Sequence, residues 1–435
     1  MTRTRQAIGT RSVPPGEVLG RVSRFDWDTM PGKLRIVRIL LVLGVLLAGT
    51  VGLYAANARV DTMRDIAEHL EPLNANVTTL YRSLADADTT VAAGFLSGRA
   101  ESREVRARYD GDVDLAVTSL AQAGVQAGGE ITYITKQLPV YTGLVERARA
   151  NNRQGLAVGV AYLRLASDLM QNQILPQTAE LQRRQASRLD DAYQRAGSVP
   201  VVALVACGLS LAGLILTQIF LFQRTHRVAN PGLVAASAAV LIGLVWWAVA
   251  EAASAGPLTN SHHHSQSVSE ALGPAQIAAL QARTIESLGL ARTGTTTELD
   301  FNARMQRLAR HGGALAAARE LATDQTGRDL VEVAAKEGSS YSTAHNKVRQ
   351  LDDSAQYAAA IEAAVSTQET SAATAFDRLD KALIRAIEHE RGAFGKDIDR
   401  ARGWLTGLPI GIGTLALIAA VGAALGVRQR LDEYR

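Results

Sequence analysis

The stretch ILLVLGVLLAGTVGLYAA, residues Ile39–Ala56, decides how the rest of the chain is interpreted. It carries no charged side chain and has close to the roughly 20 residues that an α-helix needs to cross a bilayer core. Three further stretches have the same character: Val199–Phe222, Leu233–Ala250 and Trp404–Val427. The order of membrane helix, polar segment and membrane helix therefore occurs twice. This order is typical of a sensor or an adaptor.

The residue composition favours helices in both polar segments. Alanine, leucine and charged residues of both signs dominate them, and neither shows the sustained alternation of a β-strand. We therefore predict an all-α protein with four transmembrane helices and two extracytoplasmic helical-bundle domains in a tandem repeat. The predicted boundaries, in chain order, are a basic cytoplasmic N-terminus at 1–38, transmembrane helix 39–57, bundle 58–197, transmembrane helix 198–222, cytoplasmic loop 223–232, transmembrane helix 233–254, bundle 255–403, transmembrane helix 404–427 and cytoplasmic tail 428–435.

The distribution of charge predicts which side of the membrane each part faces. Residues 1–57 hold eight lysines or arginines against three acidic residues, and the loop 223–232 holds two arginines and no acidic residue. The polar segments are nearly balanced, with 16 basic and 17 acidic residues in 58–197 and with 17 and 19 in 255–403. Because positively charged flanks stay in the cytoplasm, we expect a plasma-membrane protein with both termini inside. A signal peptide cleaved near Ala56-Asn57-Ala58 is the alternative, which the long leader before the apolar run disfavours.

Helical periodicity indicates how the polar segments are built. Apolar residues three and four positions apart recur over Val60–Phe95 and over Phe376–Ile398, which is the spacing of a seam between helices. We expect each seam to continue directly into the neighbouring transmembrane helix. Asn74 and Asp88 interrupt the first seam, and we interpret them as polar core positions that fix register, in preference to ligand contacts. Helix breaks are predicted at Ser97-Gly98, Gly124–Gly129, Asn151–Gly155, Gly273-Pro274 and Gly312-Gly313.

No sequence pattern for catalysis is present. The chain has no glycine-rich phosphate loop, nucleophile elbow or kinase signature, and its one cysteine lies in the second apolar stretch. The segments assigned to the cytoplasm are too short to fold a catalytic domain. We therefore predict that the protein is not an enzyme and uses no cofactor and no metal. We interpret the run His262-His263-His264 as a polar loop in preference to a weak metal site, and we assign His345 and His389 to surface or core roles.

One polar stretch is a candidate partner-binding site on the extracytoplasmic side. The sequence RARANNRQG places Arg147, Arg149 and Arg153 beside Asn151 and Asn152. Guanidinium and amide groups can hold a carboxylate or an acidic protein face, so these five residues are our candidates for that contact. The simpler interpretation is a helix end, with cations in the last turn and with Asn and Gly as the cap. The two interpretations are compatible.

The cytoplasmic flanks and the fourth apolar stretch carry further signals. Candidate contacts with a cytoplasmic protein are Arg21, Arg24, Arg224, Arg227, Arg428 and Arg430, although binding to membrane lipids explains the same positions. This pattern does not indicate nucleic-acid binding. In the fourth stretch, the spacings Gly407-xxx-Gly411 and Gly422-xxx-Gly426 predict close helix packing within the membrane.

Two longer stretches resemble a known family. The first is LPVYTGLVERARANNRQG from Leu138 with AYLRLAS from Ala161, and the second is HNKVRQLDD from His345 with YAAA from Tyr357. Together with the four apolar stretches, they make the chain similar to the actinobacterial GlnX family of four-pass membrane proteins. The resemblance implies a link between an extracytoplasmic solute-binding lipoprotein, which captures glutamate or aspartate, and a cytoplasmic serine/threonine protein kinase that controls nitrogen metabolism. It implies no ligand-contact residues.

The residues by themselves support a related hypothesis. Two outward bundles framed by membrane helices, with no output domain in the chain, indicate a signal-transducing adaptor that hands its signal to another protein. Two alternatives stay open: a direct small-molecule sensor of the chemoreceptor type, and a non-signalling envelope scaffold. A transporter is disfavoured because the four apolar stretches hold no charged residue.

Overall fold

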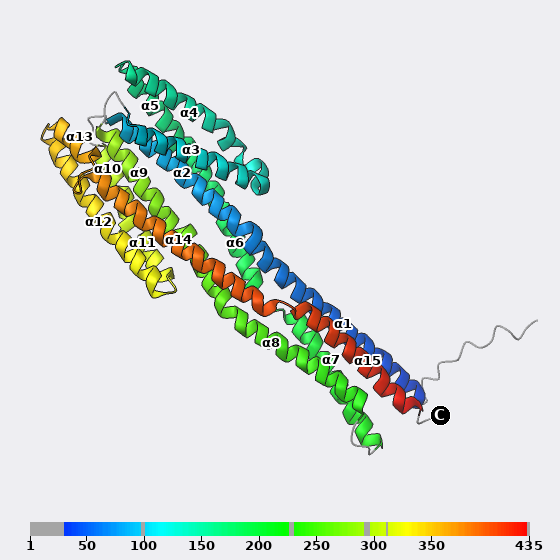
Figure 1. Cartoon of the computed structure of the whole chain (residues 1–435). Coiled ribbons are helices and arrows are strands. Elements are labelled where there is room, and N and C mark those ends of the chain that lie inside the picture. The colour runs from blue at the N-terminus through cyan, green and yellow to red at the C-terminus, as the bar shows by residue number, and fades with distance from the viewer. Residues whose placement is uncertain (1–29, 97–100, 226–229, 291–295, 310–311, 433–435) are drawn as a thin grey trace, which may run out of the picture. The chain divides into compact units, whose positions relative to one another are not determined.

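The computed structural model describes residues 30–96, 101–225, 230–290, 296–309 and 312–432, and this part of the chain is helical with no β-strand (Figure 1). The prediction of an all-α protein is therefore confirmed. The chain divides into two compact units. The apolar unit contains the described residues of Met1–Leu53, Val201–Val245 and Ile410–Arg435. The bundle unit contains Tyr54–Pro200 and Trp246–Pro409, which we call its first half and its second half.

Four helices carry the apolar stretches that suit a membrane. They are α1 (Met30–Asp65), α7 (Val201–Thr225), α8 (Pro231–Gln266) and α15 (Leu408–Asp432). Each helix contains a charge-poor window of high hydropathy that is long enough to cross a bilayer, as the sequence predicts. Most of the residues in these windows are not buried within the protein, which suits helices whose apolar faces meet lipid.

Small residues bring α8 and α15 together within the apolar unit. A Cβ added to Gly422 would lie 2.8 Å from the carbonyl oxygen of Gly232, and a Cβ on Gly232 would lie 2.6 Å from the Cα of Gly426. The Asn230 side chain donates to the carbonyl of Gly426 at 2.5 Å. The prediction of close packing at Gly422-xxx-Gly426 is therefore confirmed, because only glycine leaves room for two backbones at these distances.

The first half of the bundle unit contains five α-helices after α1 among the described residues. They are α2 (Glu71–Leu96), α3 (Arg103–Ala127), α4 (Thr132–Arg153), α5 (Val158–Leu169) and α6 (Leu175–Gly197). The Ser102 hydroxyl caps α3 by accepting a hydrogen bond from the Val105 amide at 3.2 Å. Gly128 follows α3 with a φ of 55°, where glycine is favoured, so the predicted break in Gly124–Gly129 is confirmed.

The second half repeats this plan with more interruptions. Its helices are α9 (Gly273–Leu290), α10 (Thr296–Ala309), α11 (Ala314–Leu321), α12 (Gln325–Asp353), α13 (Tyr357–Val365) and α14 (Ala372–Leu405). The Asp324 carboxylate caps α12 by accepting from the Gly327 amide at 2.6 Å. The Ser371 hydroxyl caps α14 in the same way, by accepting from the Thr374 amide at 3.2 Å.

Three prolines are accommodated by a local widening of the helix. The π-helical segments Ile66–Leu70, Met170–Ile174 and Ser267–Leu272 stand directly before Glu71-Pro72, Leu175-Pro176 and Gly273-Pro274. Proline lacks an N–H and crowds the carbonyl four residues earlier, and a wider turn relieves both problems without ending the helix. The predicted break at Gly273-Pro274 is therefore wrong.

The helices that lead from the apolar stretches into the bundle unit are continuous, whereas those that lead back out of it are interrupted. The apolar stretch of α1 continues without a break to Asp65, as predicted, and α8 likewise runs unbroken to Gln266. In contrast, α6 ends before an extended Ser198 close to Pro200. The seam of α14 also stops, because Gly407 adopts a φ of 85° and Pro409 follows it. The prediction that this seam continues into the fourth span is wrong, and Gly407 lies outside α15.

Both halves of the bundle unit share one buried apolar core. Val91 of α2 and Tyr141 of α4 belong to the same buried cluster as Leu280 of α9 and Leu379 of α14. Helices α2 and α9 lie side by side, and α9 also packs on α14 (Figure 1). The sequence predicts two bundles, whereas the structure has one compact unit, because the apolar faces of α2 and α9 cover each other.

Candidate functional site

The five predicted partner-binding residues lie at the end of α4 but do not form one surface. Arg147 and Arg153 are exposed, and Asn151 and Asn152 are half-buried. Arg149 is turned into the protein, where its guanidinium donates to Glu101 and to Glu146, both at 2.8 Å, and stands 4.2 Å above the Tyr109 ring centroid. The structure therefore leaves two of the three guanidinium groups on the surface.

The same residues form a helix end with a defined hydrogen-bond pattern. The amide of Gly155, at a φ of 71°, donates to the Asn152 carbonyl at 2.9 Å, and the Leu156 amide donates to the Asn151 carbonyl at 3.0 Å. This pair of bonds is a Schellman motif, so the interpretation as a helix cap is confirmed. Asn151 and Asn152 lie within the last turn of α4, and Gly155 occupies the left-handed position of the cap.

The second half closes α12 with the same motif at a different residue. Ala355 adopts a φ of 57°, its amide donates to the Asp352 carbonyl at 2.9 Å, and the Gln356 amide donates to the Leu351 carbonyl at 2.9 Å. Alanine is strained in this left-handed conformation, which glycine adopts freely. The two halves therefore share the same C-terminal turn, which has a glycine, Gly155, after α4 and an alanine, Ala355, after α12.

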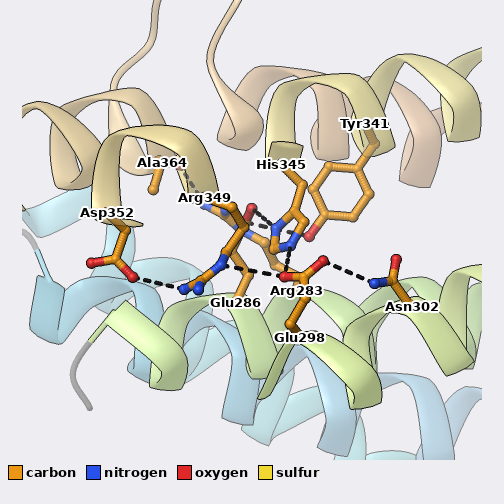
Figure 2. Close-up of polar contacts among 9 residues, drawn as sticks. All are labelled: Arg283, Glu286, Glu298, Asn302, Tyr341, His345, Arg349, Asp352 and Ala364. Atoms are coloured by element: carbon orange, nitrogen blue, oxygen red, sulfur yellow. Dashed lines mark hydrogen bonds and ion pairs between the residues drawn. The ribbon is translucent and has the colours of Figure 1, made fainter. Parts of the chain in front are cut away.

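A buried charged centre lies among α9, α10 and α12 in the second half (Figure 2). Glu286 accepts hydrogen bonds from Arg283 of the same helix and from Tyr341 Oη at 3.3 Å, and its other oxygen lies 2.8 Å from His345 Nδ1. The Arg283 guanidinium also donates to the carbonyl of Ala364 at 3.0 Å. Four polar groups thus satisfy one another away from solvent.

The centre extends to the surface on its other side. His345 Nε2 lies 3.1 Å from Glu298, which also pairs with Arg349 at 3.3 Å (Figure 2). The His345 ring stacks on Phe301 with 3.4 Å between ring centroids. Two carboxylates therefore hold opposite nitrogens of one buried imidazole. Of the surface and core roles that the sequence left open for His345, the structure shows the core role.

Electrostatics keep Glu286 ionised in this centre. Burial by itself raises the pKa of Glu286, but the charge of Arg283 and the hydrogen bond and charge of His345 outweigh it and hold this pKa below the usual range. An ionised Glu286 in turn compensates Arg283, which is fully buried. The charges of this centre therefore hold α9 against α12.

The first half has a smaller polar centre around Asp88. This carboxylate accepts from Gln171 Nε2 at 2.8 Å, from Ser167 Oγ at 3.0 Å and from Tyr141 Oη at 3.5 Å. Burial raises the pKa of Asp88 to about 6, although the three hydrogen bonds oppose the rise. The interpretation of Asp88 as a polar core position is confirmed. Asn74 is also buried, as that interpretation expects.

The three consecutive histidines lie in α8 and not in a loop, so that prediction is wrong. The helix turns them to different neighbours: His262 Nε2 lies 2.9 Å from Asp190, and His264 Nδ1 lies 2.5 Å from Glu390. The acidic partners come from α6 and α14, which are distant in sequence. Among the described residues, no group of three or more histidine, cysteine and acidic side chains is arranged to hold a metal ion.

An open groove of about 800 Å³ runs between the two halves. One wall is a stripe of α6 that includes Pro176, Ala179 and Ala186, and the other wall includes Pro274 and Ile277 of α9. The polar side chains that line the groove are Tyr81, Gln182, Arg183, Ser187, Asp190, Ser269, Glu270, Gln281, Arg304 and Arg307. The sequence analysis missed this groove because no motif marks it, and its walls come from separate segments.

The predicted cytoplasmic contacts are mostly beyond what the structure describes. Arg21, Arg24 and Arg227 lie outside the described residues. Arg224 and Arg430 fall near the ends of α7 and α15, where only the backbone is described, and Arg428 is exposed on α15. The predicted break at Ser97-Gly98 also lies outside the described residues.

Comparison with known proteins identifies the first half. A family model described as an actinobacterial sensor domain matches residues 62–194, which begin in α1 and end in α6. No curated protein and no solved structure matches the chain. The four apolar helices and the sensor domain define a multi-pass membrane protein of the sensor class. The match fits a sensor membrane protein of actinobacteria, and it covers less than half of the chain.

Proposed function

We propose that this protein is a transmembrane signal-transducing sensor that reads an amino-acid-loaded solute-binding protein outside the membrane and signals to a cytoplasmic serine/threonine protein kinase. The amino acid in this proposal is glutamate or aspartate, which the resemblance to the GlnX family implies. The charge distribution supports the orientation, because the basic flanks lie beside the four apolar stretches and the two polar segments are balanced.

The observation that carries the proposal is the course of α1. The helix contains the first apolar stretch, and the sensor-domain match begins at residue 62 within the same helix. An α-helix is stiff along its axis because every backbone group is hydrogen-bonded within it. A displacement of the sensor domain therefore reaches the apolar stretch through continuous backbone. Small shifts of packed helices are a known form of signalling transition.

Cross-linking in native membranes tests the partners. A photo-reactive amino acid at Arg153, which is exposed at the end of α4, is expected to capture a solute-binding lipoprotein when glutamate or aspartate is present. The same amino acid at Arg428 is expected to capture a protein kinase. A probe at Val333, which is exposed on α12 outside the matched domain, is the control. Capture of neither partner at Arg153 and Arg428 contradicts the proposal.

Cysteine labelling tests the orientation separately. Cys207 is the only native cysteine, so Cys207→Ser gives a background without thiols. In that background, a cysteine at Arg103 is expected to react with a membrane-impermeant maleimide in intact cells, whereas a cysteine at Arg428 reacts only after lysis. The reverse result contradicts the assigned orientation.

A further inference from the structure

Two arginines in the groove between the halves have no partner in the described structure. Arg304 and Arg307 stand three residues apart on α10, so they share one face of the helix. Neither forms a hydrogen bond or ion pair with another described residue, whereas the buried Arg149 and Arg283 are each held by glutamates. Arg304 is half-buried, whereas Arg307 is exposed. A half-buried cation that forms no ion pair is costly, so Arg304 is the kind of group that a ligand can satisfy.

The two guanidinium groups affect each other. Burial lowers the pKa of Arg304, and the charge of Arg307 lowers it further, against the opposing influence of Tyr81 and Asp300. A bound anion would relieve this repulsion because it places negative charge between two positive groups. The two guanidinium groups therefore place two positive charges on one face of the groove, and neither is held in an ion pair with another described residue.

The walls beside the arginines are apolar. Pro176, Ala179 and Ala186 face the groove from α6, and Pro274 and Ile277 face it from α9. These side chains suit the carbon skeleton of a ligand. The carboxylates of Asp190 and Glu270 also line the groove, and they repel a molecule with many negative charges. The combination favours a compact molecule with one acidic group over a polyanion such as nucleic acid.

We propose that this groove binds a small organic anion, with its carboxylate at Arg304 and Arg307 and its apolar part on the walls of α6 and α9. The site goes beyond the proposed function, because it gives the sensor a second input that acts directly on the bundle unit. A planar guanidinium pairs with a carboxylate through two parallel hydrogen bonds, which gives the site geometric selectivity as well as charge.

The position of the groove explains how its occupancy reaches the helices. Pro176 and Pro274 line opposite walls, and each comes directly after a π-helical segment, Met170–Ile174 and Ser267–Leu272. Such segments occur often at functional sites. A ligand that touches both walls holds the first half against the second half beside these two turns.

Thermal unfolding of the full chain in lipid nanodiscs tests the proposal. The probes are benzoate, phenylacetate, indole-3-acetate and hexanoate at millimolar concentration, each paired with its neutral amide. At least one acid is expected to raise the unfolding temperature while its amide does not. Arg304→Gln and Arg307→Gln are each expected to weaken binding of that acid about tenfold or more. Arg103→Gln, an exposed arginine on α3, is the matched control and is expected to bind normally.

The same unfolding measurements show whether Arg304 binds a ligand or only stabilises the fold. Without a probe, Arg304→Gln is expected to unfold at the same temperature as the natural chain or higher, because it removes a charge that burial disfavours. No shift with any acid, equal shifts with acids and amides, or normal binding by both groove variants would each overturn the proposal. If Arg304→Gln fails to fold, binding of the acid by Arg307→Gln, whose arginine is exposed, decides whether the groove is the site. Capture of the protein partners is measured independently, so this site can fail while the proposed function stands.

Discussion

Replacing Glu286 by glutamine removes the negative charge that pairs directly with Arg283 in the second half. The Glu286 side chain is 1% exposed, and it contacts Arg283, Tyr341 and His345. Glutamine keeps the shape but leaves the guanidinium buried beside a neutral amide. Removing one partner of a buried ion pair costs about 3–5 kcal/mol, since the other charge stays desolvated. We expect a loss of stability of this size.

Thermal unfolding of the full chain in nanodiscs, followed by the helical circular dichroism signal, measures the effect. Each kcal/mol lowers the unfolding temperature of a domain of this class by about 2–4 °C, so Glu286→Gln is expected to lower it by about 6 °C or more. Glu180→Gln is the matched control, because Glu180 pairs with Arg183 and Arg184 on the exposed face of α6. Solvent screens that pair, and we expect little change.

The pH dependence and a second variant sharpen the test. The pKa of Glu286 is lowered in the folded protein, so its contribution is present above the pKa of an unfolded glutamate and is lost as pH falls through the lower folded value. The difference between the natural chain and Glu286→Gln is therefore largest near neutral pH and narrows in acid. Combining Glu286→Gln with Arg283→Met is expected to recover stability, because no charge stays buried. Equal unfolding temperatures for Glu286→Gln and Glu180→Gln, or no recovery of stability in the double variant, would refute the reasoning.

Three other substitutions have defined outcomes in the same assay. Ala355→Gly is expected to stabilise the protein by about 1 kcal/mol, because Ala355 has a φ of 57°, which glycine adopts without strain. Ala359→Gly in α13 is the control and is expected to destabilise the protein by a similar amount. A lower unfolding temperature for Ala355→Gly would contradict the strain assigned to Ala355. Asp88→Asn is expected to stabilise the protein at pH 7.5 by about 2–3 kcal/mol, because the pKa of Asp88 is raised to about 6 and its ionised form is disfavoured by folding. That gain should shrink as pH falls from 6 towards 4, and a constant gain would rule out titration of Asp88. Gly422→Ala is expected to lower the unfolding temperature, because its Cβ would lie 2.8 Å from the Gly232 carbonyl oxygen, whereas Gly413→Ala, with its nearest atom 4.0 Å away, is expected to be tolerated.

Features that depend on local sequence were predictable. A charge-free run as long as Ile39–Ala56 has few alternatives to a membrane helix, and the seam over Val60–Phe95 predicts a buried face that the structure confirms at Met63, Val77 and Leu84. The cap after α4 was also predictable, because Gly155 adopts the left-handed conformation that glycine favours.

Features that depend on neighbours in space were not predictable in the same way. Pro274 does not break the helix, because the π-helical turn Ser267–Leu272 directly before α9 accommodates it. Arg149 has the same sequence context as Arg147, yet a pair of glutamates and Tyr109 draw it inward. The pair Arg283 and Glu286, three residues apart in an apolar run, was the available sign of a buried charged centre, but its partner His345 lies in another helix.

The sequence by itself determined the membrane spans, the helical class and the twofold order of the chain, because hydrophobicity and helical period are local properties of the residues. The tertiary structure decided that the two polar segments share one core and not two. It also decided which charges are compensated, since Arg283 meets Glu286 and His345 while Arg304 and Arg307 face an open groove. The physical reason is that burial and ion pairing depend on distances between helices, and these distances are set by how α2, α6, α9 and α10 pack, not by the spacing of residues along any one of them.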